Sequence, residues 1–265
     1  MKKIAVLIAI VLSMPQATFA SGETIGSLSH IHQVKVLGKK ILLGTHEGLY
    51  QYQGVDKVLR MSPEVFDVMG LSIDGKRIYA SGHPGPGSKF PEPVGLVLST
   101  NSGKSWKMIS LQGKVDFHLL ESRGSELYGA DSQSGDLLYS KDSGKRWVSR
   151  GKNIFSDIAL SPTGKGSALA LNQGKLFETK DSFKSTSEIK LNFPLTQIEW
   201  NSKRLVASSG ANLFISSDFG RTWKKHYSFR NPIGILAHSS ELLVAVVGSQ
   251  VWNSSDEGRT FTLAD

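Results

Sequence analysis

The sequence predicts an all-β fold, a six-bladed β-propeller, and three observations favour it. A segment of about eleven residues occurs five times, and the copies start at Leu96, Leu137, Leu176, Leu213 and Val251. They follow one another at intervals of 41, 39, 37 and 38 residues, a length typical of a four-stranded antiparallel blade. Leu49 begins a further strand-like run of the same kind, 47 residues before Leu96. Six such units account for the chain after its N-terminal segment.

The N-terminal segment has the composition of a secretory signal peptide. Lys2 and Lys3 precede an apolar run at residues 4–12, and the small residue Ala20 offers a cleavage position. An apolar run of about nine residues is too short to cross a bilayer, which takes about 20. We therefore expect residues 1–20 to be removed on export. Residues 21–265 should form a single β-propeller domain in the periplasm or outside the cell.

Each unit contains further strand-like runs before the recurring segment. Examples are residues 31–37 and 40–44 in the first unit, and residues 117–121 and 126–129 in the third. The expected unit is therefore three strands, a turn and a short fourth strand. The second unit is longer because it carries a Gly- and Pro-rich insertion at residues 82–93. Its four prolines forbid a regular ladder and predict a stiff rim loop that carries His83.

The recurring segment carries the pattern Ser/Thr-x-Asp-x-Gly-x-Thr-Trp, and the copy from Ser216 to Trp223 matches it at every position. It resembles the Asp-box of bacterial neuraminidase repeats. In such a turn the Asp accepts backbone amides, the Gly supplies a positive φ, and the Trp packs beneath the hairpin. The resemblance implies structural Asp-box turns, remote from the functional face. The positions concerned are Asn101, Gly103, Trp106, Asp142, Gly144, Trp147, Asp181, Asp218, Gly220, Trp223, Asp256, Gly258 and Phe261.

Five of the seven histidines precede residue 119 and recur at related positions of the repeat. They open the first strands, or end the second strands, of the first three units. Units four to six place Ser156, Thr196 and Gly234 in the comparable first-strand stretches. Since these strand ends lie on one face of a propeller, we expect a His-rich axial face. Its candidate ligand-binding residues are His30, His32, His46, Asp67, Met69, His83, Asp116 and His118.

The residue types at this face suit a metal ion or a small polar ligand. Imidazole, thioether and carboxylate groups together are ligands for copper or another late divalent ion. His32 and His118 are the candidate metal ligands in that interpretation. Histidines near strand ends also form ordinary hydrogen bonds between blades. A divalent metal ion, a small polar ligand and purely structural hydrogen bonds are therefore the three alternatives for this face.

Three stretches resemble a group of exported bacterial glycosyl hydrolase-like propellers with BNR repeats, of the sialidase and sortilin type. They are SHIHQVKVLGKKILLGTHEGLYQY, MGLSIDGKRIYASGHPGPGSKFPEPVGLVLST and KVDFHLLE. The resemblance covers essentially the whole mature chain and is strongest from His30 to Trp147. It implies a propeller of unsettled activity, because the name of the group comes from its repeats. Related propellers bind partners and catalyse nothing, so the fold decides little about function.

Composition disfavours several function classes. The 265-residue chain has no Cys, which rules out disulfides, thiolate metal sites and a cysteine nucleophile. Its formal net charge is +8, or +6 without Lys2 and Lys3, and the dispersed charge does not favour nucleic acid. The first Arg is Arg60, and the Arg-Ile-Pro motif of sialidases is missing, so a sialidase is disfavoured.

We expect an exported, non-enzymatic and monomeric propeller, with no nucleic-acid partner and no membrane insertion. It would bind a partner protein or a small polar ligand at the His-rich axial face. One alternative is a glycoside hydrolase-like enzyme with two carboxylates at the same mouth, for which Asp67, Asp116 and Asp157 are candidates. The other is a copper-type metal-binding protein that uses the same face.

Overall fold

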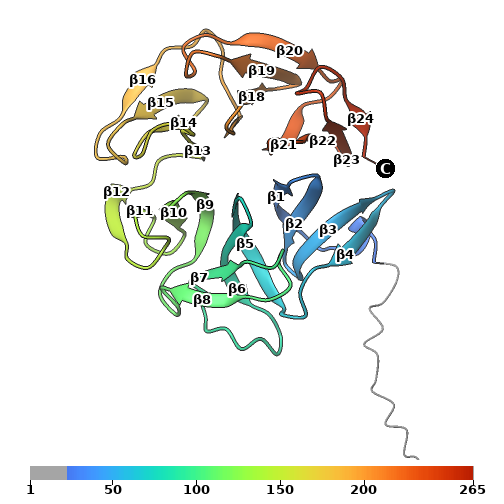
Figure 1. Cartoon of the computed structure of the whole chain (residues 1–265), viewed down its shortest axis with the longest axis vertical. Coiled ribbons are helices and arrows are strands. Elements are labelled where there is room, and N and C mark those ends of the chain that lie inside the picture. Colours follow the sequence, from blue (N-terminus) through green and yellow to red (C-terminus); the bar gives the residue numbers. More distant parts are fainter. Residues whose placement is uncertain (1–22, 265) are drawn as a thin grey trace, which may run out of the picture.

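The protein is a ring of six blades, each a four-stranded antiparallel sheet, so the predicted six-bladed β-propeller is confirmed (Figure 1). The structure is a computed structural model that describes residues 23–264. The signal peptide expected at residues 1–20 lies outside these described residues. Within residues 23–264, no helix combines the length and the apolar character needed to span a membrane.

The strands follow the chain in order within every blade. Blade 1, preceded by the short 3₁₀ helix η1 (Ile25–Ser27), contains β1 (Ile31–Leu37), β2 (Lys40–Thr45), β3 (Gly48–Gly54) and β4 (Lys57–Arg60). Blade 2 contains β5 (Phe66–Asp74), β6 (Arg77–Pro84), β7 (Leu96–Ser99) and β8 (Lys107–Ser110). Blade 3 contains β9 (Phe117–Arg123), β10 (Glu126–Asp131), β11 (Asp136–Ser140) and β12 (Val148–Lys152).

The other three blades repeat this order. Blade 4 contains β13 (Asp157–Leu160), β14 (Ala168–Asn172), β15 (Lys175–Thr179) and β16 (Ser187–Ile189). Blade 5 contains β17 (Gln197–Trp200), β18 (Leu205–Ser209), β19 (Asn212–Ser216) and β20 (Lys224–Ser228). Blade 6 contains β21 (Ile233–His238), β22 (Leu243–Val247), β23 (Gln250–Ser254) and β24 (Thr262–Leu263).

The first strand of each blade is innermost, and the fourth lies at the outer edge (Figure 1). Neighbouring first strands contact one another all round the axis, from β1 and β5 through to β21 and β1. Because the first strands all run the same way along the axis, their beginnings meet at one mouth of the central channel. This arrangement gathers side chains that are about 40 residues apart in sequence.

The hydrophobic core is divided among the six boundaries between blades. At the boundary between blades 6 and 1, Val36 of β1 packs in one cluster with Val244 of β22 and Ala264. The Tyr52 hydroxyl also donates to the Ala264 carbonyl oxygen at 3.1 Å. In the described part of the chain every sheet contains only consecutive strands, so side-chain packing, not an exchanged strand, closes the ring.

The turns between the third and fourth strands of blades 2 to 6 share one set of hydrogen bonds. In blade 5 the Ser216 hydroxyl donates to Asp218 Oδ1 at 2.8 Å and accepts the Gly220 N–H at 2.9 Å. Asp218 Oδ1 also accepts the Thr222 N–H at 2.8 Å. The Thr222 hydrogen bonds lower the pKa of Asp218 to about 2, so the charged carboxylate holds the reversal. The equivalent contacts recur at Asn101, Asp142, Asp181 and Asp256.

The irregular loop of the blade 2 insertion begins after Pro84, later than the start at residue 82 that the prolines predict. β6 continues to Pro84, which pairs with Phe66 of β5, so the prediction of a loop from residue 82 is wrong for its first three residues. Proline is tolerated at Pro84 because it is the last residue of the strand. The loop after Pro84 brings Glu92 back to His83, with 2.7 Å between Glu92 Oε1 and His83 Nδ1.

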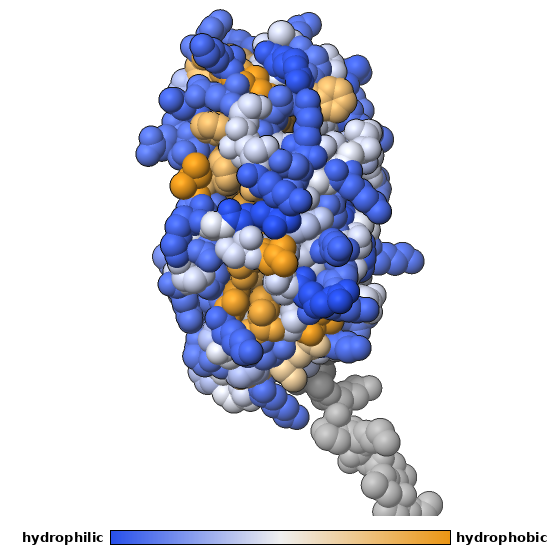
Figure 2. Space-filling model, turned by 90° about the vertical axis from the view of Figure 1, so that its left-hand side faces the viewer, coloured by the Kyte–Doolittle hydropathy of each residue, from blue (hydrophilic) through white to orange (hydrophobic). Residues whose placement is uncertain are grey.

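The side of the outer rim that Figure 2 shows is mostly hydrophilic, with separate apolar areas. Large apolar side chains that are about half exposed include Met108, Val148 and Ile154. Single exposed apolar residues are ordinary on a folded surface and need no function.

Candidate functional site

The mouth at the beginnings of β1, β5 and β9 carries a set of histidines and aspartates that we call the His face. Two groups of two histidines and one aspartate stand out, and each lies at a boundary between two blades. The first boundary group is His32, His46 and Asp67, and the second boundary group is His83, Asp116 and His118. His30, next to the first group, completes the His face.

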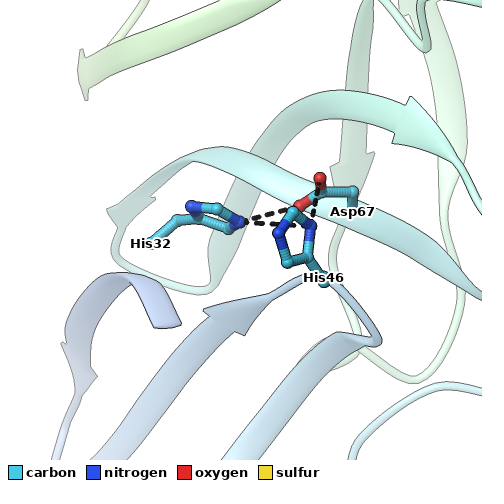
Figure 3. Close-up of side chains that lie close together, drawn as sticks. All are labelled: His32, His46 and Asp67. Atoms are coloured by element: carbon cyan, nitrogen blue, oxygen red, sulfur yellow. Dashed lines mark hydrogen bonds and ion pairs between the residues drawn. The ribbon is translucent and has the colours of Figure 1, made fainter. Parts of the chain in front are cut away.

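The first boundary group joins blades 1 and 2, and its three side chains converge on one point (Figure 3). His32 Nε2 lies 3.1 Å from Asp67 Oδ1 and 3.5 Å from His46 Nδ1. His46 Nδ1 lies 2.6 Å from Asp67 Oδ2. The His30 ring stacks on the His32 ring, with 5.3 Å between centroids. Burial lowers the pKa of His32, and the neighbouring imidazoles add to this against the opposing charge of Asp67, so His32 favours its neutral form.

The backbone approaches closely beneath this group. Gly82 of β6 has φ of 148°, and a Cβ there would lie 1.8 Å from the carbonyl oxygen of Asp67. Only glycine fits that contact, so Gly82 allows β6 to lie where it pairs with the Asp67 segment of β5.

The second boundary group joins blades 2 and 3 and has a different charge balance. His83 contacts a carboxylate at each nitrogen, Glu92 at Nδ1 and Asp116 Oδ2 at Nε2, the latter at 3.2 Å. His118 Nε2 lies 2.7 Å from the same Asp116 Oδ2, which also accepts the Ser132 hydroxyl at 2.7 Å. Burial opposes the charge of His83, but Glu92 and Asp116 outweigh it and raise the pKa of His83.

The structure thus separates the two histidines that the sequence suggested as ligands of one ion. His32 belongs to the first boundary group and His118 to the second, although both line the same cavity. Met69 lies at the irregularity of β5 between Val68 and Gly70 and belongs to neither group. Asp131, at the end of β10, accepts the Asp116 N–H at 3.1 Å and fixes the backbone there.

A cavity of about 350 Å³ opens beside the His face. Its other wall is formed by Ser156, Thr196 and Gly234, the residues that units four to six place opposite the histidines. A second cavity, of about 250 Å³, lies toward the other end of the first strands.

A charged cluster separates the two cavities and was not foreseen from the sequence. Lys35 Nζ lies 2.6 Å from Glu121 Oε1 and 3.3 Å from Glu199 Oε1, and these three residues line both cavities. Burial acts to lower the pKa of Lys35, but the two carboxylates outweigh it and raise that pKa. Lys35 therefore stays charged and links the inner strands of blades 1, 3 and 5 across the axis.

The repeat did contain a signal for this cluster. Each of the three residues pairs with the second-strand residue seven positions later, which makes Lys35, Glu121 and Glu199 equivalent in their blades. An alignment of the inner strands beyond their first residues would have shown three charges at one inward position.

Asp157 of β13, a carboxylate that the sequence placed at the axis, is held by backbone amides. Its Oδ1 accepts the Ile158 N–H at 2.9 Å, and its Oδ2 accepts the Ile198 N–H at 2.8 Å from the next blade. Burial, reinforced by the charge of Glu199, raises the pKa of Asp157 to about 8. Burial also raises the pKa of Glu199 itself, to about 7 against the opposing charge of Lys35.

Comparison with known proteins shows the fold. No protein-family model matches the chain, and no curated protein matches it. The structure resembles one described as YCF48 bound to D1 peptide, with a TM-score of 0.53 and 17% identity over 89% of this chain and 83% of that one. It also resembles a nidogen/laminin complex, with a TM-score of 0.58 and 13% identity over 86% and 90% of the two chains. A GH74 enzyme of Niastella koreensis gives a TM-score of 0.58 and 13% identity over 89% of this chain but only 38% of the enzyme. This chain is therefore a β-propeller by structure.

Proposed function

We propose that this chain is an exported, non-enzymatic propeller of the BNR/Asp-box group that binds a partner protein or a small polar ligand at the His face. The observation that carries the proposal is the open cavity at the His face. His32 and His118 of the two boundary groups line one side of it, and blades 4 to 6 line the other. Its lining is polar on both sides, and the Lys35 cluster bounds it inside the channel. A concave, preformed and polar mouth on a rigid ring is suited to hold an extended segment or a small polar molecule.

Two of the similar structures support a binding role. One is described as bound to a peptide and the other as a complex of two proteins. The recurring turns, which have the hydrogen bonds expected of Asp-boxes, lie at the ends of the third strands. This leaves the beginnings of the first strands as the surface for recognition.

A photo-crosslinking amino acid at the mouth tests the proposal. Ser156 lines the cavity at the His face. We expect the photo-crosslinking amino acid at this position to give covalent adducts in cells that make the protein. Ser240, which lines the opposite cavity and is also exposed, is the matched control and should give none. Mass spectrometry distinguishes the two occupants, because a partner protein adds a large mass and a small polar ligand adds a small one. Equal adducts at both positions, or none at either, would contradict the proposal.

The second candidate function is a glycoside hydrolase, and one observation favours it. Asp157 and Glu199 have pKa values raised to about 8 and about 7, and such values are those of a general acid. A panel of chromogenic glycosides tests this candidate. We expect no hydrolysis by the wild-type protein. Hydrolysis that Asp157→Asn, Asp67→Asn or Asp116→Asn abolishes would replace the binding role with an enzymatic one.

A further inference from the structure

The first boundary group brings three metal-ligating atoms from three strand ends to one point. Its atoms are the Nε2 of His32, the Nδ1 of His46 and a carboxylate oxygen of Asp67 (Figure 3). We propose that this group is a binding site for a late divalent transition-metal ion such as Zn²⁺ or Cu²⁺. Two imidazoles and one carboxylate form a donor set that these ions prefer.

The distances between the donor atoms suit one ion. Tetrahedral ligands that lie about 2.0–2.1 Å from a zinc ion are about 3.3–3.4 Å from one another. The two contacts of His32 Nε2, at 3.1 Å and 3.5 Å, are close to that spacing. The contact between His46 and Asp67, at 2.6 Å, must widen, and the 44% exposed side chain of His46 leaves it room to move.

The gathering of imidazole nitrogens at the first boundary group also favours a cation. Three imidazoles, including His30, lie within 5.5 Å of one another between ring centroids, and Asp67 is the carboxylate that contacts two of them. A divalent ion accepts the lone pairs of His32 and His46 at one centre, together with an oxygen of Asp67.

The second boundary group provides a built-in comparison. It has the same residue types, but each nitrogen of His83 already contacts a carboxylate, and the shared Asp116 oxygen contacts two imidazoles and one hydroxyl. Asp116 and Glu92 therefore already occupy both nitrogens of His83, and Asp116 also occupies Nε2 of His118. We therefore place the ion in the first group and not in the second.

Such an ion would have an open coordination position. Three protein ligands leave room for a fourth donor, and the exposed His46 lies on the solvent side. The inference does not depend on the proposed partner, because the chain alone supplies the three ligands and is tested without any partner.

Calorimetric titration of the purified chain, prepared without a histidine tag, tests the site with ZnCl₂ and with CuCl₂ near neutral pH. We expect one equivalent to bind, and His46→Gln and His32→Gln each to weaken binding by at least about tenfold. Asp67→Asn should weaken it as well. The double variant His83→Gln/His118→Gln is the control, and it should bind as the wild type does. X-ray absorption of the bound ion should report two imidazole ligands.

Circular dichroism and the melting temperature of the metal-free variants show whether each is folded. His46 is the preferred variant because its side chain is 44% exposed and contributes little to the core. Two results would overturn the inference. One is no binding above that of His32→Gln/His46→Gln, and the other is binding that the second-group variants lose instead.

Discussion

At the residue scale, the same residue types behave differently at two successive blade boundaries. His46 directly follows β2, His83 lies near the end of β6, and both contact the aspartate of the next blade. His83 also meets Glu92 of the blade 2 loop, which favours its charged form, whereas His32 of the first group is surrounded by other imidazoles. The additional carboxylate, Glu92, therefore accompanies the raised pKa of His83.

The Glu92→Gln variant should lower the pKa of His83. Burial already opposes the charge of His83, and loss of the Glu92 carboxylate removes part of the attraction that outweighs this effect. NMR titration should give His83 a pKa above 6.5 in the wild type and a lower one in the variant. Because the pKa of His83 is raised on folding, protonated His83 stabilises the folded protein below pH 6.5. This contribution is lost as the pH rises through the pKa of His83 in the folded state. An unchanged His83 titration would contradict the assigned role of Glu92.

The Asp157→Asn variant should change how stability depends on pH. The folded pKa of Asp157 is about 8, above its usual value of 3.8, so the folded chain holds a proton that the unfolded chain releases. Wild-type stability should therefore fall as pH rises from about 4 to about 8. Asparagine does not titrate, so urea unfolding at several pH values should show a shallower fall in the variant. Equal slopes would mean that Asp157 is ionised in the folded protein.

At the element scale, the turn between the third and fourth strands of blade 4 lacks two residues of the recurring turn pattern, and a different aromatic side chain takes over the packing. Phe183 stands where the other turns have glycine, with φ of 60°, and Thr186 stands where the others have tryptophan or, in blade 6, phenylalanine. The Phe183 ring is buried against Tyr128 and Phe155, at 5.4 Å and 5.2 Å between centroids. An aromatic ring thus still fills the space beneath the turn, but it comes from a different position.

The Phe183→Gly variant should be less stable than the wild type despite its easier backbone. Relief of the positive φ gains about 1 kcal/mol, whereas loss of a buried phenyl ring costs about 3–5 kcal/mol. We expect a net loss of about 2–4 kcal/mol in urea unfolding. The added substitution Thr186→Trp restores the pattern of the other blades and should recover part of that loss. A Phe183→Gly variant as stable as the wild type would show that backbone strain outweighs the packing of the ring.

At the scale of the whole molecule, the ring has one boundary unlike the other five. Five boundaries join blades that are consecutive in the chain, whereas the sixth joins blade 6 to blade 1 with no chain connection between them. The closure depends on the cluster around Val36 and Val244 and on the Tyr52 contact with Ala264. We expect this boundary to open first under stress.

Two matched variants test that weakness. Val244 and Val206 are both fully buried in second strands, but Val244 belongs to the closing cluster and Val206 to the cluster between blades 5 and 6. Each change to alanine should cost about 2 kcal/mol. In hydrogen exchange, Val244→Ala alone should raise the exchange of blade 1, because it loosens the boundary that lacks a chain connection. Equal exchange of blade 1 in both variants would show that the closure is no weaker than the other boundaries.

The repeat determined the number of blades and the order of strands, because hydrophobic alternation and turn residues act within about 40 residues of chain. Leu213 and Asp218 are examples, since each specifies a strand or a turn through its near neighbours. The position of the His face also follows from strand order, and the structure brings His30, His32 and His46 together there.

The tertiary structure alone decided which of these side chains meet. Lys35 finds Glu121 and Glu199 only because three blades converge on the axis, and His32 and His118 are separated because each contacts the aspartate at a different boundary. These pairings join residues 86 and 164 positions apart for Lys35, beyond the reach of any local pattern. Charge pairing depends on distances through space, and those are set by the radius of the ring and the packing between blades.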